Sequence, residues 1–153
     1  MIKRYSCVHI FLHRSEGVFM SKGHGAKATL ICSDDSGLLY SYSCYDLNRE
    51  GWQQVRDTED GEIWIARDAL TEPEIHEKLK RLPSGRKKMI IKRIPRPVPF
   101  DQLFEAGKIR ISNAGGNWET EGQNDTMAMR VLFKFYDEYQ LQGKPPEHIF
   151  IFY

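Results

Sequence analysis

His24 is the side chain whose neighbours most favour chemistry, because a glycine stands on each side of it in Gly23-His24-Gly25. The two glycines let the backbone turn tightly and leave the imidazole accessible. A neutral imidazole in such a place can accept a proton from a nucleophile, which makes His24 a candidate general base. The same tripeptide also fits a plain turn without a chemical role, and the residues alone favour that interpretation.

A second candidate for chemistry is the segment 122–126, Gly-Gln-Asn-Asp-Thr, which leads into a long apolar stretch. Asn124 or Asp125 suits the N-cap of a helix, because a short side-chain oxygen can accept an amide proton of the first turn. From 125 to 139, apolar residues cover a wide arc at about 100° per residue, which predicts a central helix packed under much of the fold. The start of such a helix is a positive pole that favours an anion or a thiolate. If the protein has a reaction centre, we expect it there.

The elements that must position these two segments are predicted to be mostly strands. Residues 26–32 and 38–45, joined by the polar turn 33–37, predict a β-hairpin. Other predicted strands are 5–13, 62–66, 87–94 and 148–153, with 108–112 as a strand or a loop. Helices are predicted at 71–81, where Thr71 and Pro73 provide start signals, and at 100–106, while 46–61 is expected to be loop. The predicted fold class is α+β, a single domain 1–153 in which a mainly antiparallel sheet of about five or six strands packs on a central C-terminal helix.

The order of these segments resembles the circularly permuted papain-like hydrolases, which include relatives of the NlpC-type amidases and the lecithin-retinol acyltransferases. The matching pieces are 23–31, 37–43 and 122–132, so the resemblance spans most of the chain in element order through short motifs. It implies a permuted papain-like architecture that acts on an amide or ester. In that architecture His24 is the general base, position 125 is the nucleophile site, and the first amides of the helix contribute to an oxyanion hole.

Position 125 departs from this family, because it is Asp125 where the family has its nucleophilic cysteine. A carboxylate at a helix N-terminus is stabilised and is a poor nucleophile towards amides. Three interpretations stay open: an inactivating substitution, a natural hydrolase-like domain that only binds, or an ordinary first-turn acid in an unrelated fold. With Asp125 in place we expect little or no turnover.

The third catalytic group is expected from the strand after His24. Ser41 and Ser43 share one face of that strand, and Tyr40 and Tyr42 share the other. We select Ser43 as the third catalytic candidate and Tyr42 as a binding candidate, although the same alternation is ordinary for a half-buried strand. The other candidates for binding are Gly122, Asn124 and Trp118.

The cysteines and histidines predict no metal site. Cys7, Cys32 and Cys44 are an odd number without metal-type spacing, and strand cysteines are usually small core residues, as in a reduced cytosolic protein. His9 and His13 would lie about 13 Å apart on a strand, too far to share an ion. We therefore expect neither a metal nor a cofactor.

Charge and hydropathy limit the classes of partner and the location that the sequence predicts. The 153 residues include 22 Lys and Arg and 21 Asp and Glu, so no overall field recruits nucleic acid. The local basic stretch 78–96 is expected to be a solvated helix face and strand ends, without the aromatic residues that stack bases, so nucleic acid is not favoured. Salt-sensitive binding of nucleic acid through this stretch stays open as a third possibility. No run approaches the ~20 apolar residues of a membrane span. With no signal peptide in sight, the expected location is the cytoplasm or a signal-peptide-independent delivery route, as for a toxin or effector domain.

A non-enzymatic interaction protein, such as an immunity or adaptor domain, is the alternative function. In that case Trp52, Trp118 and the acidic loop 119–125 would contact a partner, since aromatic residues anchor interfaces. The expected partner is accordingly either an amide- or ester-containing substrate or another protein.

Overall fold

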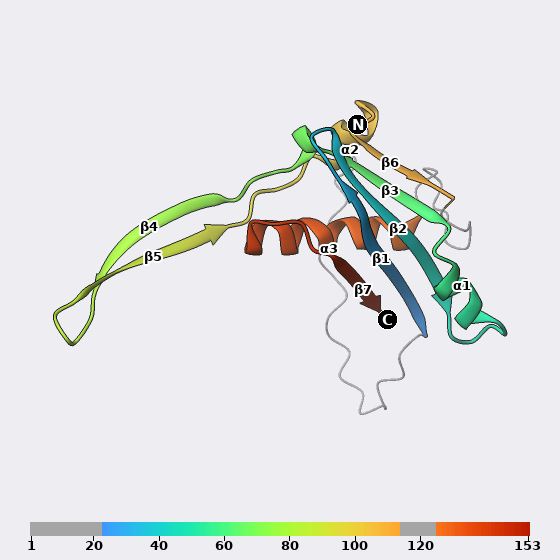
Figure 1. Ribbon diagram of the computed structural model, residues 1–153, viewed down its shortest axis with the longest axis horizontal. Helices are drawn as coiled ribbons and strands as arrows, with labels where there is room; N and C mark the ends of the chain where they lie inside the picture. Colours follow the sequence, from blue (N-terminus) through green and yellow to red (C-terminus); the bar gives the residue numbers. More distant parts are fainter. Residues whose placement is uncertain (1–22, 114–124) are drawn as a thin grey trace, which may run out of the picture.

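The computed structural model describes residues 23–113 and 125–153, and it has the predicted α+β composition (Figure 1). Its strands are β1 (His24–Ser33), β2 (Gly37–Asp46), β3 (Gly61–Ala66), β4 (Glu74–Arg81), β5 (Lys87–Ile94), β6 (Ile109–Ser112) and β7 (His148–Phe152). Its helices are α1 (Trp52–Thr58), α2 (Phe100–Glu105) and α3 (Thr126–Gln142), with a 3₁₀ turn at Arg67–Ala69. The predicted strand 5–13 lies outside the described residues.

Five strands form one antiparallel sheet in the order β6-β3-β2-β1-β7. Its centre is the predicted hairpin of β1 and β2, in which His24 pairs with Asp46 and Ala28 pairs with Tyr42. The turn is fixed by Asp34, whose carboxylate accepts the backbone N–H groups of Ser36 and Gly37. The sequence therefore predicted the hairpin and its turn chemistry correctly.

Helix α3 crosses one face of this sheet and supplies most of the core (Figure 1). Ala26 and Ala28 of β1 are fully buried, and these small side chains let the helix approach the sheet closely. The helix buries Val131, Leu132 and Phe135, among others, as its wide apolar arc predicted. It ends at Gly143, whose φ of 74° is the left-handed conformation that suits a glycine C-cap.

The predicted helix at 71–81 is wrong, because residues 74–81 form strand β4. Thr71 and Pro73 are plausible helix-start residues, but every residue of β4 instead pairs with a residue of β5, from Glu74 with Ile94 to Arg81 with Lys87. A turn containing Gly85, at φ 78°, closes this hairpin. Cross-strand pairing with a segment that the sequence did place correctly thus overrode a local helix signal.

The predicted loop at 46–61 is wrong in part, because residues 52–58 form helix α1. This seven-residue helix has no side-chain cap, and none of its residues is buried. It is held by contacts with β2: Trp52 stacks on Tyr45 with 5.8 Å between ring centroids, and the carbonyl of Arg56 accepts the Ser43 hydroxyl at 2.9 Å. Because tertiary contacts and not apolar periodicity stabilise it, the sequence pattern carried no signal for it.

Candidate functional site

Asp125 is the N-cap of α3, which confirms one of the two predicted N-caps, Asn124 or Asp125. The residue is buried, with only 4% of its surface exposed. One carboxylate oxygen, Oδ1, accepts the N–H groups of Met127 at 2.7 Å and Ala128 at 2.9 Å. The Tyr42 hydroxyl donates to the same oxygen at 3.1 Å. These bonds fix the start of α3 against β2, and they occupy two of the helix amides that the family resemblance assigns to an oxyanion hole.

The second oxygen of Asp125 faces a cysteine that comes from the sheet. The Cys44 Sγ lies 3.9 Å from Asp125 Oδ2, and both side chains are buried. Burial, strengthened by the neighbouring carboxylate, raises the pKa of the Cys44 thiol. Burial also raises the pKa of Tyr42. Both groups are therefore protonated donors towards Asp125 at neutral pH, and the cluster is a closed hydrogen-bonded unit.

His24 lies on the same face of the sheet as this cluster, one side-chain position further along. In the register of β1 and β2, Tyr42 pairs with Ala28, Cys44 with Ala26 and His24 with Asp46, and these alternate pairs share the face of the sheet on which α3 packs. The imidazole Nε2 is 3.9 Å from Asp46 Oδ1, with about a quarter of the His24 side chain exposed. The structure thus brings His24 to the face that holds Asp125, and it provides His24 with a carboxylate neighbour.

Ser43 does not join this group, because it lies on the opposite face of the sheet. Its hydroxyl donates to the backbone carbonyl of Arg56 in α1, and Ser41 donates to Glu59 on the same side at 2.7 Å. Tyr40 faces α3, where its hydroxyl donates to the carbonyl of Pro146. The predicted alternation of serines and tyrosines is therefore correct, and it separates Ser43 from Asp125 by the thickness of the sheet.

The remaining candidates divide between described and undescribed residues. Gly122, Asn124, Trp118 and the rest of the acidic loop up to residue 124 lie outside the described residues. Trp52 is only partly exposed, because its ring stacks on Tyr45 and the Arg56 guanidinium lies 5.1 Å from the ring centroid. Trp52 accordingly serves to attach α1 to the sheet.

Sequence reasoning missed Cys44 and Asp46 as neighbours of the two chosen residues. Part of their signal was present in the hairpin, because the register of β1 and β2 is regular from His24 to Leu30. Between Leu30 and Cys32 the register shifts, so counting outward from the turn would not have given these pairs. Once Ala28 pairs with Tyr42, His24 must oppose Asp46, and Cys44 must share their face. What could not be read from the hairpin is where along that face the start of α3 would lie.

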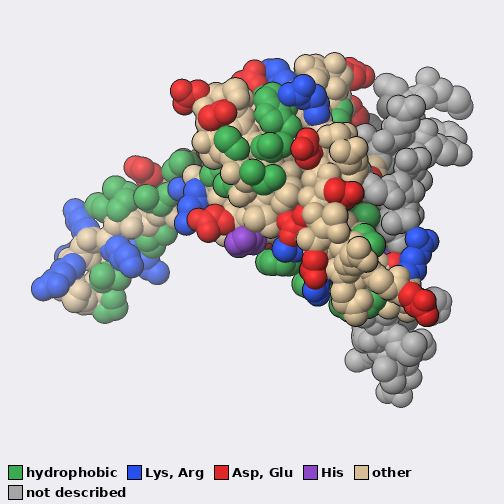
Figure 2. All heavy atoms as spheres, turned by 45° about the vertical axis from the view of Figure 1, so that its right-hand side comes forward, with side chains coloured by type: hydrophobic (Ala, Val, Ile, Leu, Met, Phe, Trp, Pro, Cys, Tyr) green, Lys and Arg blue, Asp and Glu red, His purple; other side chains and the backbone are tan. Residues whose placement is uncertain are grey.

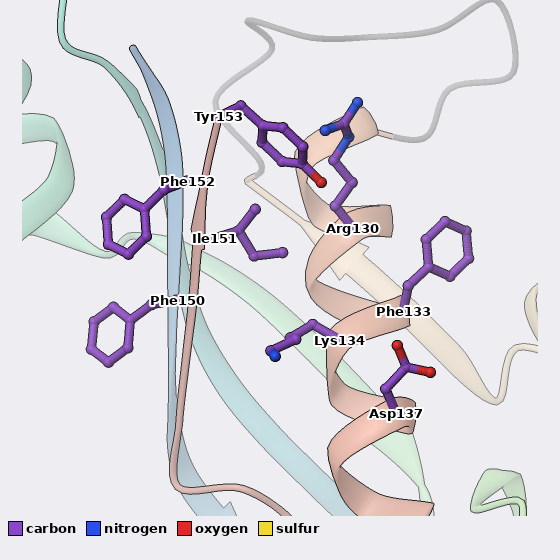
Figure 3. A pocket seen from close by; sticks show the side chains of 8 residues that line it. All are labelled: Arg130, Phe133, Lys134, Asp137, Phe150, Ile151, Phe152 and Tyr153. Atoms are coloured by element: carbon purple, nitrogen blue, oxygen red, sulfur yellow. The ribbon is translucent and has the colours of Figure 1, made fainter. Parts of the chain in front are cut away.

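An open groove of about 330 Å³ runs between α3 and β7 (Figure 3). Ile151 points from β7 towards the helix, while Phe150 and Phe152 point to the other side of the strand. The Arg130 guanidinium lies 3.8 Å from the centroid of the Tyr153 ring at one end of the groove. The groove shares no lining residue with the Asp125 cluster, so the two are separate features.

The most prominent surface feature is the hairpin of β4 and β5, residues Glu74–Ile94, which we call the arm. It projects from the body of the protein in Figure 1, and Figure 2 displays exposed hydrophobic and basic side chains along it. In β4 every residue is exposed, and in β5 six of eight are. The arm is thus a two-stranded ribbon that contributes nothing to the core of the sheet.

The pairing register gives the arm two chemically different faces. Directly paired residues share a face, and successive pairs alternate between faces. What we call the apolar face consists of Ile75, Glu77, Leu79, Arg81, Lys87, Met89, Ile91 and Arg93. What we call the lysine face consists of Glu74, His76, Lys78, Lys80, Lys88, Ile90, Lys92 and Ile94.

The base of the arm is anchored to the end of α3. The side-chain amide of Gln140 accepts the Arg96 N–H at 2.6 Å and donates to the Arg96 carbonyl at 2.9 Å. The Arg93 guanidinium lies against Gly143, in space that a Cβ there would fill. A cation is favourable at that end of a helix. Tyr139 of α3 also donates a hydrogen bond to Glu72, just before the arm. The arm therefore leaves the body from a fixed base.

Across the described ranges 23–113 and 125–153, no group of His, Cys, Asp and Glu side chains is arranged to hold a metal ion. None of the helices in those ranges combines the length and apolar character that crossing a membrane demands. Compared with known proteins, the chain matches no family model, no curated protein and no solved structure.

Proposed function

We propose that this protein is a non-enzymatic interaction domain and that the arm is its docking element. The observation that carries the proposal is the exposed apolar face. Ile75, Leu79, Met89 and Ile91 are each at least 50% exposed on a ribbon that stands away from the body. An isolated two-stranded hairpin is marginally stable in water, so a partner that covers this face would also order the arm. Contiguous exposed apolar side chains are typical of interaction surfaces.

The chemistry of the apolar face defines the partner that would fit it. Its four apolar side chains are bordered by Arg81 and Lys87 near the tip, with Glu77 the one acid among them, while Arg93 at the base is held against Gly143. The complementary surface is therefore a protein patch with an apolar centre and a rim of carboxylates. Apolar contacts would supply most of the affinity, and the charged rim would fix the orientation and raise the association rate.

The environment of Asp125 supports binding over catalysis. A nucleophile has to be exposed to the substrate, and its oxyanion hole needs unoccupied donors. Asp125 is enclosed, and it already accepts the amides of Met127 and Ala128. Its position favours a structural role at the start of α3.

The test is to replace Ile75, Leu79, Met89 and Ile91 together by threonine, which keeps strand propensity and removes the apolar contacts. A matched control replaces four exposed apolar residues of the body, Ile31, Leu47, Val55 and Leu141, by threonine. A partner would be isolated with the wild-type chain, identified, purified and titrated against all three proteins. We expect the arm variant to lose at least 100-fold in affinity and the control to stay within about twofold.

Cross-links between the reconstituted partners should map to residues 75–91. If the purified partner binds the arm variant as tightly as the wild type, or if the cross-links fall on the body, the arm is not the docking element and the proposal fails.

A papain-like amide or ester hydrolase scaffold, silenced at position 125, is the second candidate function. The observation in its favour is that His24 and Asp125 lie on one face of the sheet, with Asp46 beside the imidazole. In the variant Asp125→Cys, an imidazole and a helix N-terminus close enough to act would lower the pKa of the new thiol. Iodoacetamide labelling of residue 125, followed by peptide mass spectrometry across pH 5–9, measures this pKa. If the pKa of the thiol at position 125 is near that of free cysteine and does not change when His24→Ala is added, the hydrolase scaffold is ruled out as a candidate function.

A further inference from the structure

The lysine face of the arm is a strip of positive charge created by the strand register. Lys78 and Lys80 of β4 and Lys88 and Lys92 of β5 all lie on it, with Lys80 directly opposite Lys88. All four are exposed, and none forms an ion pair within residues 23–113 and 125–153. Because alternate residues of a strand share a face, Lys78 and Lys80 lie on the same face of β4, whereas a helix at 71–81 would have separated them. The expected helix face is therefore wrong for Lys78 and Lys80, while all four lysines are solvent-exposed as expected.

The positive charge of the chain is concentrated in the arm. Residues 74–94 contain eight Lys and Arg and two Glu, a net charge of +6, and since the whole chain carries +1 the rest carries −5. From Lys78 to the end of β5 there is no acid at all. On the lysine face, like charges also oppose each other directly in the pair Lys80–Lys88 near the tip. Such pairs destabilise a ribbon in water, so an anionic ligand along it would relieve a repulsion that is built into the arm.

We propose that the lysine face binds the phosphate backbone of a nucleic-acid duplex, without sequence preference. A two-stranded ribbon has the width that the major groove of DNA admits, and lysines along one face suit contacts with phosphates. The arm contains no Phe, Tyr or Trp with which to stack single-stranded bases, which favours a duplex. The acidic remainder of the chain is repelled by the phosphates, so contact is confined to the arm. This proposal uses the face opposite to the one in the proposed function and does not rest on it.

The affinity should follow the counterion release of phosphate contacts. With about four to six contacts from the lysine face and the tip, the logarithm of the binding constant should fall against the logarithm of the salt concentration with a slope of about −4 to −5. The probe is a fluorescein-labelled 24-base-pair DNA duplex of random sequence, titrated with the full chain and followed by fluorescence anisotropy from 50 to 300 mM NaCl. A dissociation constant in the micromolar range or weaker is expected at physiological salt.

Three variants test the assignment. Lys78, Lys80, Lys88 and Lys92 replaced together by glutamine should weaken binding at 100 mM NaCl by at least 30-fold and reduce the steepness of the slope by about 3 to 4. The same four positions changed to arginine should keep the affinity within about threefold, which separates lost charge from a misfolded arm. The matched control replaces Arg49, Lys108, Lys134 and Lys144 of the body by glutamine and should change the affinity by no more than about twofold.

Several results would overturn the proposal. Among them are no detectable binding at 50 mM NaCl, a slope near zero, and equal loss in the arm and body variants. Poly-glutamate is the competitor that distinguishes a nucleic acid from an acidic protein. If it displaces the duplex at equal charge concentration, the lysine face recognises negative charge in general and the assignment to nucleic acid is wrong.

Discussion

At the scale of single residues, the start of α3 is fixed by three hydrogen bonds to one carboxylate oxygen of Asp125. Asp125 was chosen from the sequence as a nucleophile position or as an N-cap, and its contacts with Met127, Ala128 and Tyr42 are those of a cap. The sequence could predict the cap because a short acid before an apolar helix has a local cause. It could not predict the bond to Tyr42, which depends on how two distant segments pack.

Replacing Asp125 by alanine should therefore cost about 2–4 kcal/mol in the free energy of unfolding. A lost N-cap contributes about 1 kcal/mol, and leaving the buried Tyr42 hydroxyl without its acceptor contributes a further 1–3 kcal/mol. Urea denaturation followed by tryptophan fluorescence measures the change. Asp137→Ala, at an exposed site on the same helix, is the control and should stay within about 0.5 kcal/mol of the wild type. Equal effects of the two substitutions would contradict the role given to Asp125.

The thiol of Cys44 should be inert in the folded protein, while that of Cys32 should react. Cys32 is exposed, whereas Cys44 is buried beside Asp125 with its pKa raised. Iodoacetamide at pH 8, followed by peptide mass spectrometry, should label Cys32 within minutes and Cys44 only after unfolding. The raised pKa also means that Cys44 ionises more readily in the unfolded state. Its contribution to stability is complete below the ordinary thiol pKa of about 8.5 and declines as the pH rises beyond it. Rapid native labelling of Cys44 would show that the cluster is open.

At the scale of elements, local sequence patterns predicted those helices and strands whose patterns agree with their packing. They failed where contacts with another segment determine the secondary structure. The wide apolar arc of α3 and the alternation of strand β7 agree with their burial, and the sequence placed both elements. It also placed the hairpin β1–β2, although β2 is buried on both faces and its burial does not alternate. Thr71 and Pro73 are helix-start residues, yet residues 74–81 pair with β5 as a strand. Helix α1 has no apolar stripe and depends on Tyr45 and Ser43 of β2. Neither the strand at 74–81 nor the helix α1 can be predicted from the residues of the segment alone.

The arm should be dispensable for the stability of the body. Replacing residues 77–91 by Asn-Gly joins His76 to Lys92 through a two-residue turn and keeps the anchors at Arg93 and Arg96. Since the removed residues bury nothing in the core, the urea midpoint monitored by tryptophan fluorescence should shift by less than about 0.3 M. The same deletion should abolish both the partner binding and the duplex binding proposed above. A collapse of the fold would show that the arm packs on the body.

At the scale of the whole molecule, charge is separated along the chain, with +6 on the arm and −5 on the rest. Opposite poles of neighbouring molecules attract at low ionic strength, and salt screens that attraction over about 10 Å at 0.1 M. The second virial coefficient from static light scattering should therefore rise between 20 and 200 mM NaCl. The variant with the shortened arm should lack this rise, and the same salt response in both proteins would contradict the link to the arm.

The pairing of β7 with β1 has a consequence for synthesis of the protein. Ile149 and Ile151 of β7 lie beside Ala28 and Ala26, although the two strands come from nearly opposite ends of the described chain. On the ribosome, β1 and β2 emerge before β7. The edge of β1 that pairs with β7 therefore stays unpaired until residues 148–152 have left the exit tunnel. Contacts so distant in sequence slow folding, and an unpaired edge invites aggregation in the interval. Nascent chains stalled before residue 148 should accordingly bind ribosome-associated chaperones, and release of the remaining residues should free them.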